Sequence, residues 1–409
     1  MTKQRSLRFL TAGGGVLAAS AFGLFAPSAH AADCSTIDHV IYVAGSTAAK
    51  PFIAAVAASL QHESTPITLV YQGQGSCTGV QTMVASSPST ITGTASTFSG
   101  TGTAPVENTM GCTLDPAGTT VDVGVSDVYA KTCGPTYTLA SDVKDYHGPV
   151  QSMNFVVPTG STQLSISSEA AYLAFGLGAD AGGGVPWNDP SVFEVRAPTS
   201  GTMLMSGAVI GLPGAKWKGN QNAATSNVLT SLANDVTAGK TQTAIGIMSS
   251  GDADKNRSTV RALAFQPSGS SCGYTPDSDS TSSFDKANTR DGHYAISGPV
   301  HLYVHAPSGK IANADVQKFI DYLTGATDPD FDLIQVEAKA SVVPDCAMRV
   351  SRSEDGGALS SYMPALSCEC KFVAEATGTA PSSCTTCSTD DDCKGTGTPK
   401  CHYGYCEVK

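Results

Sequence analysis

The sequence predicts an α/β protein with a mainly parallel sheet. Short apolar runs typical of buried strands alternate with stretches of helical periodicity, at the spacing of βαβ units. The expected strands are 40–43, 68–71, 121–125, 153–157, 193–196, 244–248 and 300–304. The expected helices are 48–60, a helix that begins near Thr78, and 314–323. Residues 84–120, rich in Ser, Thr and Gly, are predicted to form a long surface insertion.

The amino terminus has the pattern of a secretory signal peptide. Three cations and no acid occur in the first eight residues, an apolar run follows at 9–25, and residues 29–31 supply an A-x-A cleavage site. Glycines interrupt the apolar run, which argues against a membrane-spanning helix, and Asp33 before Cys34 argues against a lipid anchor. We therefore expect residues 1–31 to be removed on export to a periplasmic or extracellular location, with no integral membrane segment left behind.

The charge balance excludes one class of partner. The 409-residue chain carries a formal net charge of −11, and loss of the three amino-terminal cations would make it more negative. Nucleic-acid binding needs clustered Lys and Arg to neutralise phosphates, so we expect no nucleic-acid partner. A small anion can still bind such a protein where a site supplies donors locally.

The thirteen cysteines are distributed unevenly. Six lie between residues 34 and 346, and seven lie within residues 368–406. In an exported chain disulfides are the expected state, and an odd total leaves at least one thiol free or paired between chains. Residues 350–409 lack apolar periodicity and are predicted to be a disulfide-stapled tail that resembles cysteine-rich repeats of bacterial secreted proteins. A zinc site at the Cys384-x-x-Cys387 motif is the less favoured interpretation.

Three turns between an expected strand and helix share one composition. Residues 44–48, 75–79 and 199–202 combine glycine with Ser or Thr. A helix amino terminus offers unpaired N–H groups and the positive end of its dipole, and a hydroxyl adds a further donor. Ser and Thr caps are common, but three such turns with Arg196 just ahead of the third predict an anion cradle at the carboxyl ends of the strands.

These residues resemble the phosphate-binding proteins of ABC uptake systems, which have the type II periplasmic-binding-protein fold. The segments that carry the resemblance, in the family's order, are 44–51, 71–76, 122–127, 187–202 and 244–247. The resemblance implies a two-lobed α/β architecture in which residues 36–150 and 298–349 form lobe I and residues 151–297 form lobe II. A ligand in the cleft would draw the lobes together by hinge closure.

The resemblance also implies a set of phosphate-binding positions: Ser46, Thr47, Ala48, Ser76, Asp127, Arg196, Ser200, Gly201 and Thr202. Arg196 would pair with the anion, and the hydroxyls and turn amides would donate to it. Asp127 would accept a hydrogen bond from a protonated phosphate oxygen. An ionised carboxylate repels fully deprotonated sulfate, so Asp127 would also give selectivity.

The chain departs from the family pattern near the expected site. Pro198 stands where the family has an aspartate that orients the arginine, and Cys77 and Thr78 replace small residues. Cys77 is expected to be a candidate for a bridge to Cys112 or Cys133. Phosphonates, arsenate or a phosphorylated organic molecule therefore stay open as ligands.

The resemblance implies an exported solute-binding protein that delivers phosphate or a related oxyanion to an ABC permease, with no catalytic residue, metal or cofactor. Two alternatives are an extracellular structural or adhesive protein that has lost the ligand, and a secreted phosphatase. Residues 269–273 match G-x-S-x-G in letters, but the context is not strand-to-helix. Asp252 and Asp254 begin a calcium-loop pattern that later residues break, so we expect a surface turn there. Structural roles are expected for His301, His305 and the other histidines.

Overall fold

A computed structural model describes residues 32–85, 89–100, 108–181, 184–279 and 281–407. The predicted signal peptide, 1–31, lies outside the described residues, and its cleavage stays a prediction. Within the described part of the chain, none of the helices has the length and apolar character needed to span a bilayer.

Lobe I is built on five neighbouring strands with helices on both faces. Their order is β3 (Thr68–Gly73), β2 (Val40–Gly45), β8 (Val123–Ser126), β16 (Ser297–His305) and β9 (Val143–Pro158). The first three run parallel and the last two antiparallel to their neighbours. On one face of the sheet, alternate residues such as Ile41 and Val43 pack against α1 (Lys50–Leu60) and α8 (Ala314–Leu323). Helix α2 (Ser76–Gln81) packs against the opposite face.

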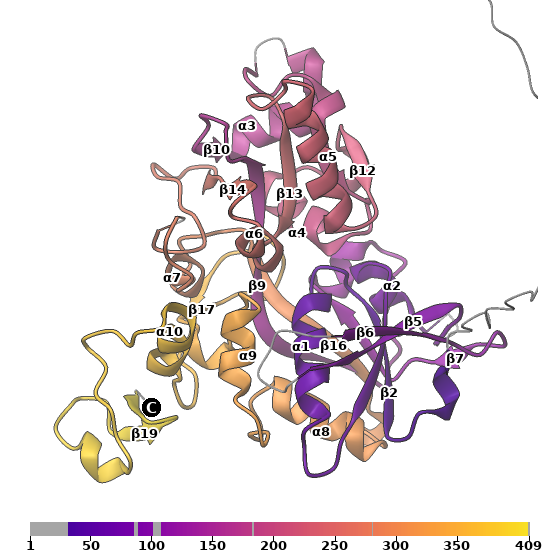
Figure 1. Ribbon diagram of the computed structural model, residues 1–409, viewed down its shortest axis with the longest axis vertical. Helices are drawn as coiled ribbons and strands as arrows, with labels where there is room; N and C mark the ends of the chain where they lie inside the picture. Colours follow the sequence, from indigo (N-terminus) through magenta and orange to yellow (C-terminus); the bar gives the residue numbers. More distant parts are fainter. Residues whose placement is uncertain (1–31, 86–88, 101–107, 182–183, 280, 408–409) are drawn as a thin grey trace, which may run out of the picture. The chain divides into compact units, whose positions relative to one another are not determined.

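Lobe II continues the same sheet across β9, the strand that runs through both halves in Figure 1. Beyond β9 lie β13 (Ile245–Ser249), β11 (Phe193–Arg196) and β12 (Asn220–Asn222), and β14 (Val260–Ala262) also pairs with β9. The helices of this lobe include α3 (Ser168–Tyr172), α4 (Gly201–Ile210), α5 (Thr225–Thr237) and α6 (Ser250–Lys255). Its core stacks Phe155 against Phe175, with Trp217 beside both.

The α/β, two-lobed fold class is confirmed, and the expected strands and helices appear within a few residues of their predicted bounds with one exception: the strand expected at 153–157 is the end of β9, which begins ten residues earlier at Val143. The lobe boundaries near residues 150 and 298 stay predictions. The prediction that residues 84–120 form a surface insertion is wrong for the described residues 94–99 and 108–113. There β5 (Thr94–Ser99) and β6 (Asn108–Thr113) extend the sheet beyond β3. Ala95 and Phe98 project from opposite faces of the sheet and are each buried in a different core cluster, so these small hydroxyl-rich segments form paired strands rather than a loop.

The cysteines form six disulfides, and the zinc interpretation of the tail is excluded because its sulfurs are bonded to one another. The pairs are Cys34–Cys112, Cys77–Cys133, Cys346–Cys368, Cys370–Cys384, Cys387–Cys401 and Cys393–Cys406. Cys272, which is exposed, is the unpaired cysteine that the odd total requires.

The tail has more core than the sequence suggested. Helix α10 (Glu369–Thr377) packs against α9 (Leu333–Lys339), and Cys368 and Phe372 are fully buried with Val150, Ile334 and Val343. The residues that make this contact, Cys368, Phe372, Val373 and Ala376, are spaced as on one face of a helix, but the pattern extends over only about two turns. Their burial depends on a partner surface that residues 334–348 supply.

Phe372→Ala should lower the free energy of unfolding by about 3 kcal/mol, because it removes a fully buried ring from this small core. Urea denaturation measures the change. Met363→Ala, at a side chain that is 70% exposed in the same segment, is the control and should change stability little. Equal effects of the two substitutions would contradict the packing of α10 on the body.

Candidate functional site

The first turn of the candidate site joins β2 to α1. Gly45 has a φ of +141°, and a Cβ there would lie 1.9 Å from the carbonyl oxygen of Val125. This close approach lets the backbone N–H of Ser46 donate to the same carbonyl. The Ser46 hydroxyl in turn accepts the N–H groups of Ala48 and Ala49, at 3.0 and 2.9 Å. Ser46 therefore holds the amino-terminal end of α1 next to the end of β8.

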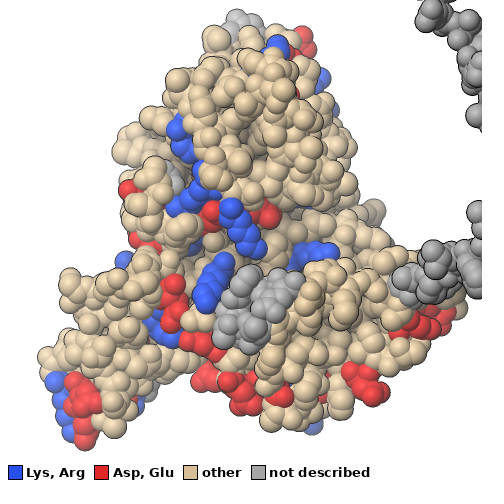
Figure 2. Space-filling model, viewed as in Figure 1, with Lys and Arg blue, Asp and Glu red and all other residues tan. Residues whose placement is uncertain are grey.

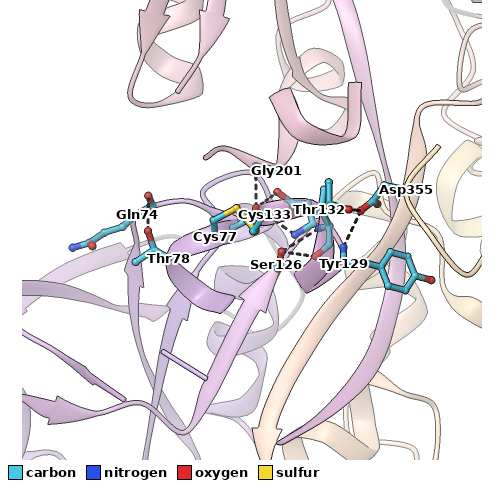
Figure 3. The surroundings of a disulfide bond; sticks show 12 residues. Gln74, Cys77, Thr78, Ser126, Tyr129, Thr132, Cys133, Gly201 and Asp355 are labelled. Carbon is cyan, nitrogen blue, oxygen red and sulfur yellow. Dashed lines mark hydrogen bonds between the residues drawn. A yellow bond between two sulfur atoms is a disulfide. The ribbon is translucent and has the colours of Figure 1, made fainter. Parts of the chain in front are cut away.

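The second turn presents Ser76 at the start of α2. Its hydroxyl donates to Oδ2 of Asp127 at 2.9 Å and accepts the N–H of Gly201 at 3.1 Å. The adjacent Cys77 is bonded to Cys133, which selects one of the two bridges considered for it. Figure 3 shows this disulfide beside Gly201 and the strand end at Ser126. The bridge fixes the second turn to the segment that follows β8.

Asp127 is the centre of the site. It follows β8, is 1% exposed, and accepts hydrogen bonds from the Ser46 hydroxyl at 2.7 and 2.6 Å to its two oxygens. Burial raises the pKa of Asp127 above its ordinary value, although the hydrogen bonds from Ser46 and Ser76 and the charge of Arg196 act in the opposite direction. A carboxylate so far from water requires donors of this kind.

The third turn, from lobe II, lies directly on the first two. The Cβ of a residue replacing Gly201 would lie 2.2 Å from the Ser76 hydroxyl and 2.4 Å from Oδ2 of Asp127, so only glycine allows this approach. The N–H of Cys77 donates to the carbonyl of Thr199 in the same contact. Ser200 is 4% exposed, and the fully buried hydroxyl of Thr202 has no hydrogen-bond partner among the described residues.

Arg196 is the last residue of β11, and its guanidinium forms hydrogen bonds to four residues. It donates to the carbonyls of Asn222 and Ala223 and to the hydroxyl of Thr225. Its fourth partner is the hydroxyl of Thr47, 2.9 Å away in lobe I. Burial lowers the pKa of Arg196, whereas the negative charges of Asp252 and Asp127 act to raise it.

Asp252 is a site residue that the sequence interpretation missed. The turn expected around it is wrong: Ser250–Lys255 form α6, which Ser249 caps by accepting the N–H of Asp252. The carboxylate of Asp252 accepts the hydroxyl of Ser249 at 2.8 Å and contributes negative charge near Arg196. Its place fifty-six positions after Arg196 gave no sequence signal.

The nine predicted residues gather at this contact, but their role in anion binding stays a prediction. Several of the expected anion donors are directed instead to protein acceptors: Ser46, Ser76 and the N–H groups of Ala48 and Gly201. The reason is the buried carboxylate of Asp127, which takes both serine hydroxyls. Thr202 and Arg196 are the parts of the site whose donors are least committed to Asp127.

A cleft with a volume of about 590 Å³ opens beside the site at Thr47. Its described lining includes Lys50, Lys255 and Lys339, from three different helices, and no carboxylate. Figure 2 shows Lys and Arg side chains gathered across the middle of this face. Burial lowers the pKa of Lys50, whose ammonium lies 5.8 Å from the centre of the Phe98 ring. The lysines are far apart in the sequence, which is why no motif revealed them.

The other candidate motifs do not assemble a catalytic site in the described chain. Residues 269–273 follow the short strand β15 (Ala264–Gln266), and a turn rather than a helix follows them. The hydroxyl of Ser271 is near only the sulfur of Cys272, at 3.8 Å. This local geometry lacks the strand-to-helix turn that a nucleophile elbow requires.

The chain matches no protein-family model and no curated protein. It is similar in structure to a putative phosphate ABC transporter substrate-binding protein with bound phosphate from Clostridium perfringens, at 13% identity and a TM-score of 0.47. It is also similar to an ABC-type phosphate transport receptor from Vibrio cholerae, at 14% and 0.47. Each match covers 75% of this chain and 99% of the other.

A possible phosphate binding protein from Planctomyces limnophilus is similar at 14% identity and a TM-score of 0.44, over 75% of this chain and 93% of the other. At these identities and TM-scores the matches carry no argument about function. The function proposed below rests on this chain's own residues.

Asp127→Asn should change the pH dependence of stability. Because burial raises the pKa of Asp127, the folded state holds its proton more tightly than the unfolded state does. Ionisation then lowers the stability of the parent protein as pH rises from about 4 through that raised pKa. The free energy of unfolding of the parent minus that of the variant should therefore fall over this range.

Urea denaturation at a series of pH values, in buffers free of phosphate, measures that difference. Asp115→Asn, in an exposed turn, is the control for loss of a carboxylate. If the free energy of unfolding of the parent minus that of Asp127→Asn rises with pH, the hydrogen bonds to Asp127 lower its pKa by more than burial raises it.

Proposed function

We propose that this protein captures phosphate, or a related protonated oxyanion, between its two lobes, and that it is a binding protein rather than an enzyme. One observation carries the proposal. A buried guanidinium, a buried carboxylate and the turns 46–48, 75–76 and 200–202 converge at one contact, with donors from both lobes. Such a set can surround an anion with donors and offer a single acceptor to its proton.

For an anion to enter the proposed site, the two lobes must separate where Gly201 contacts Ser76. An anion has no room between Gly201 and Ser76 while the amide of one donates to the hydroxyl of the other. Strands β9 and β16 join the two lobes, so bending there would move α4 away from Asp127. The anion would then receive the N–H of Gly201, the hydroxyl of Thr202 and the positive end of the α4 dipole. Arg196 would supply the full positive charge.

Asp127 gives the proposed site its selectivity. Its carboxylate can only accept, so an oxyanion that carries a proton gains a hydrogen bond there. Fully deprotonated sulfate would face a buried carboxylate with no proton between them, which is repulsive. Arsenate and phosphonates share the proton that phosphate carries and belong to the same proposed ligand class.

The lysine-lined cleft supports the proposal from outside the site. It opens at Thr47, whose hydroxyl accepts a hydrogen bond from Arg196, so one lining residue of the cleft is in direct contact with the buried cation. Positive charge at a cleft mouth raises the local concentration of anions even on a protein with a net charge of −11. Six disulfides are typical of an oxidising compartment. We propose export, and delivery of the anion to an ABC permease as its fate.

A second candidate function is favoured by the internal hydrogen bonds of the site. The hydroxyls of Ser46 and Ser76 and the N–H of Gly201 already satisfy one another and Asp127. With Pro198 in place of a carboxylate, the same contact could serve as a permanent latch between the lobes. The protein would then be an extracellular structural or adhesive protein on the same fold, without an anion ligand.

Titration calorimetry with phosphate, arsenate and sulfate separates these candidates. Capture predicts heat and thermal stabilisation by phosphate and arsenate below about 1 mM, and little by sulfate. Asp127→Asn should weaken phosphate binding and raise sulfate affinity by about tenfold or more, because it replaces the repulsive carboxylate with a donor. Asp115→Asn, at an exposed carboxylate that is not among the site residues, should leave both affinities unchanged.

The latch predicts no heat with any of the three anions in the parent protein. A parent that binds phosphate, together with an Asp127→Asn variant that gains no affinity for sulfate, would support capture and contradict the role given to Asp127.

The lysines of the cleft should act on the rate of association. The double variant Lys50→Gln, Lys255→Gln should lower the association rate constant for phosphate by about tenfold at low ionic strength, and less at high salt. Stopped-flow measurement of an environment-sensitive label follows the rate. Lys310→Gln, an exposed lysine outside the cleft, is the matched control. A change in the dissociation rate alone would contradict a steering role.

A further inference from the structure

Two histidines and an aspartate form a cluster on the strands that join the lobes. Asp145 and His147 lie on β9, and His301 lies on β16. His147 and His301 are register partners in the antiparallel pair, so their side chains project from the same face of the sheet. Asp145, two residues before His147, projects from that face as well. The pairing register therefore creates a group that no sequence spacing predicts.

The three side chains are close enough to share one ion. Nδ1 of His301 lies 2.9 and 3.0 Å from the two carboxylate oxygens of Asp145. Nε2 of His147 lies 3.7 Å from Oδ2 of Asp145. One potential ligand atom from each residue lies within 4.8 Å of the others. A tetrahedral zinc ion with bonds of about 2.0–2.1 Å spaces neighbouring ligand atoms roughly 3.4 Å apart, so only small movements are required.

The burial of the cluster differs from that of an ordinary surface ion pair. The side chain of His301 is 0% exposed, whereas those of His147 and Asp145 are 46% and 27% exposed. Nδ1 of His301 is the ring nitrogen that faces Asp145 and would ligate the ion, whereas its buried Nε2 has no hydrogen-bond partner among the described residues. The ring of Tyr129 packs edge-on against both imidazoles. One ligand is thus fixed inside, and two face solvent, from which an ion can enter.

We propose that Asp145, His147 and His301 bind a divalent transition-metal ion, with zinc as the expected occupant. Two imidazoles with one carboxylate are a donor set for zinc and its neighbours rather than for calcium or magnesium, which prefer oxygen ligands. Water would complete the coordination on the exposed side.

The site lies next to the candidate anion site but does not depend on it. His301 is also the register partner of Ser126 on β8, and Ser126 directly precedes Asp127. A bound cation would join β9 to β16 where both strands leave lobe I. It would also place positive charge one strand away from Asp127. Metal binding stands on the geometry of the three ligands alone, whether or not the protein captures an anion.

The chain offers matched controls. His305, at the end of β16, and Asp142, directly before β9, lie 2.9 Å apart and form a comparable pair that is not part of a three-ligand group among the described residues. A second set, Cys387, Cys393 and Cys406, has its sulfurs in disulfides and offers no thiolate. The free thiol of Cys272 is removed with Cys272→Ser in every protein compared.

The test is calorimetric titration of the purified protein with zinc chloride, near neutral pH and without phosphate. The proposal predicts one zinc ion per chain, and at least about a tenfold loss of affinity in His147→Ala and in Asp145→Asn. His305→Ala should bind zinc as the parent does. His147 is half-exposed, so its removal leaves the fold intact, which thermal unfolding without metal checks.

Cobalt(II) gives an independent readout, because its visible absorption reports nitrogen and oxygen ligands and should disappear in His147→Ala. Three results would overturn the proposal: no zinc heat up to about 0.1 mM, equal affinity in His147→Ala, or loss of binding in His305→Ala.

Discussion

The buried carboxylate of Asp127 is the constraint on which the centre of this molecule depends. A carboxylate removed from water is costly unless donors surround it, and here the hydroxyls of Ser46 and Ser76 supply them. Each serine has a second task, since Ser46 also accepts amides at the start of α1 and Ser76 accepts the amide of Gly201. The hydrogen bonds that stabilise the Asp127 carboxylate therefore also position backbone segments of both lobes.

Close backbone approach makes this arrangement possible. Gly45 leaves room for the carbonyl of Val125, and Gly201 leaves room for Ser76 and Asp127. The Cys77–Cys133 disulfide holds the second turn against the segment that follows β8. Whether the contact captures an anion or only latches the lobes depends on one balance. An anion is captured if the free energy of its binding to Arg196 and Thr202 exceeds the free energy lost when the hydrogen bonds between the lobes at Ser76 and Gly201 break.

Local sequence patterns predicted more of the fold than of the site's surroundings. Strands such as 40–43 and 193–196 and the helix 314–323 appear where their periodicity placed them, because each buries a continuous apolar face. The paired strands 94–99 and 108–113 did not follow from composition, because they are rich in Ser and Thr and bury only a few apolar side chains, among them Ala95 and Phe98. Asp252 was misassigned to a surface turn for a related reason: the partner that gives its charge a function, Arg196, is distant in the sequence.

The sequence by itself determined the order of strands and turns and the clustering of cysteines, since these are properties of short contiguous segments. The nine candidate anion-binding residues came from a resemblance between such segments and a known family, and their role stays a prediction. Only the tertiary structure decided where the donors point, that Asp127 takes the serine hydroxyls, and that Lys50, Lys255 and Lys339 line one cleft. It also decided that Asp145, His147 and His301 share one face of two paired strands. The physical reason is that strand register and lobe contact bring together residues from 51 to 156 positions apart, and no local pattern encodes such a distance.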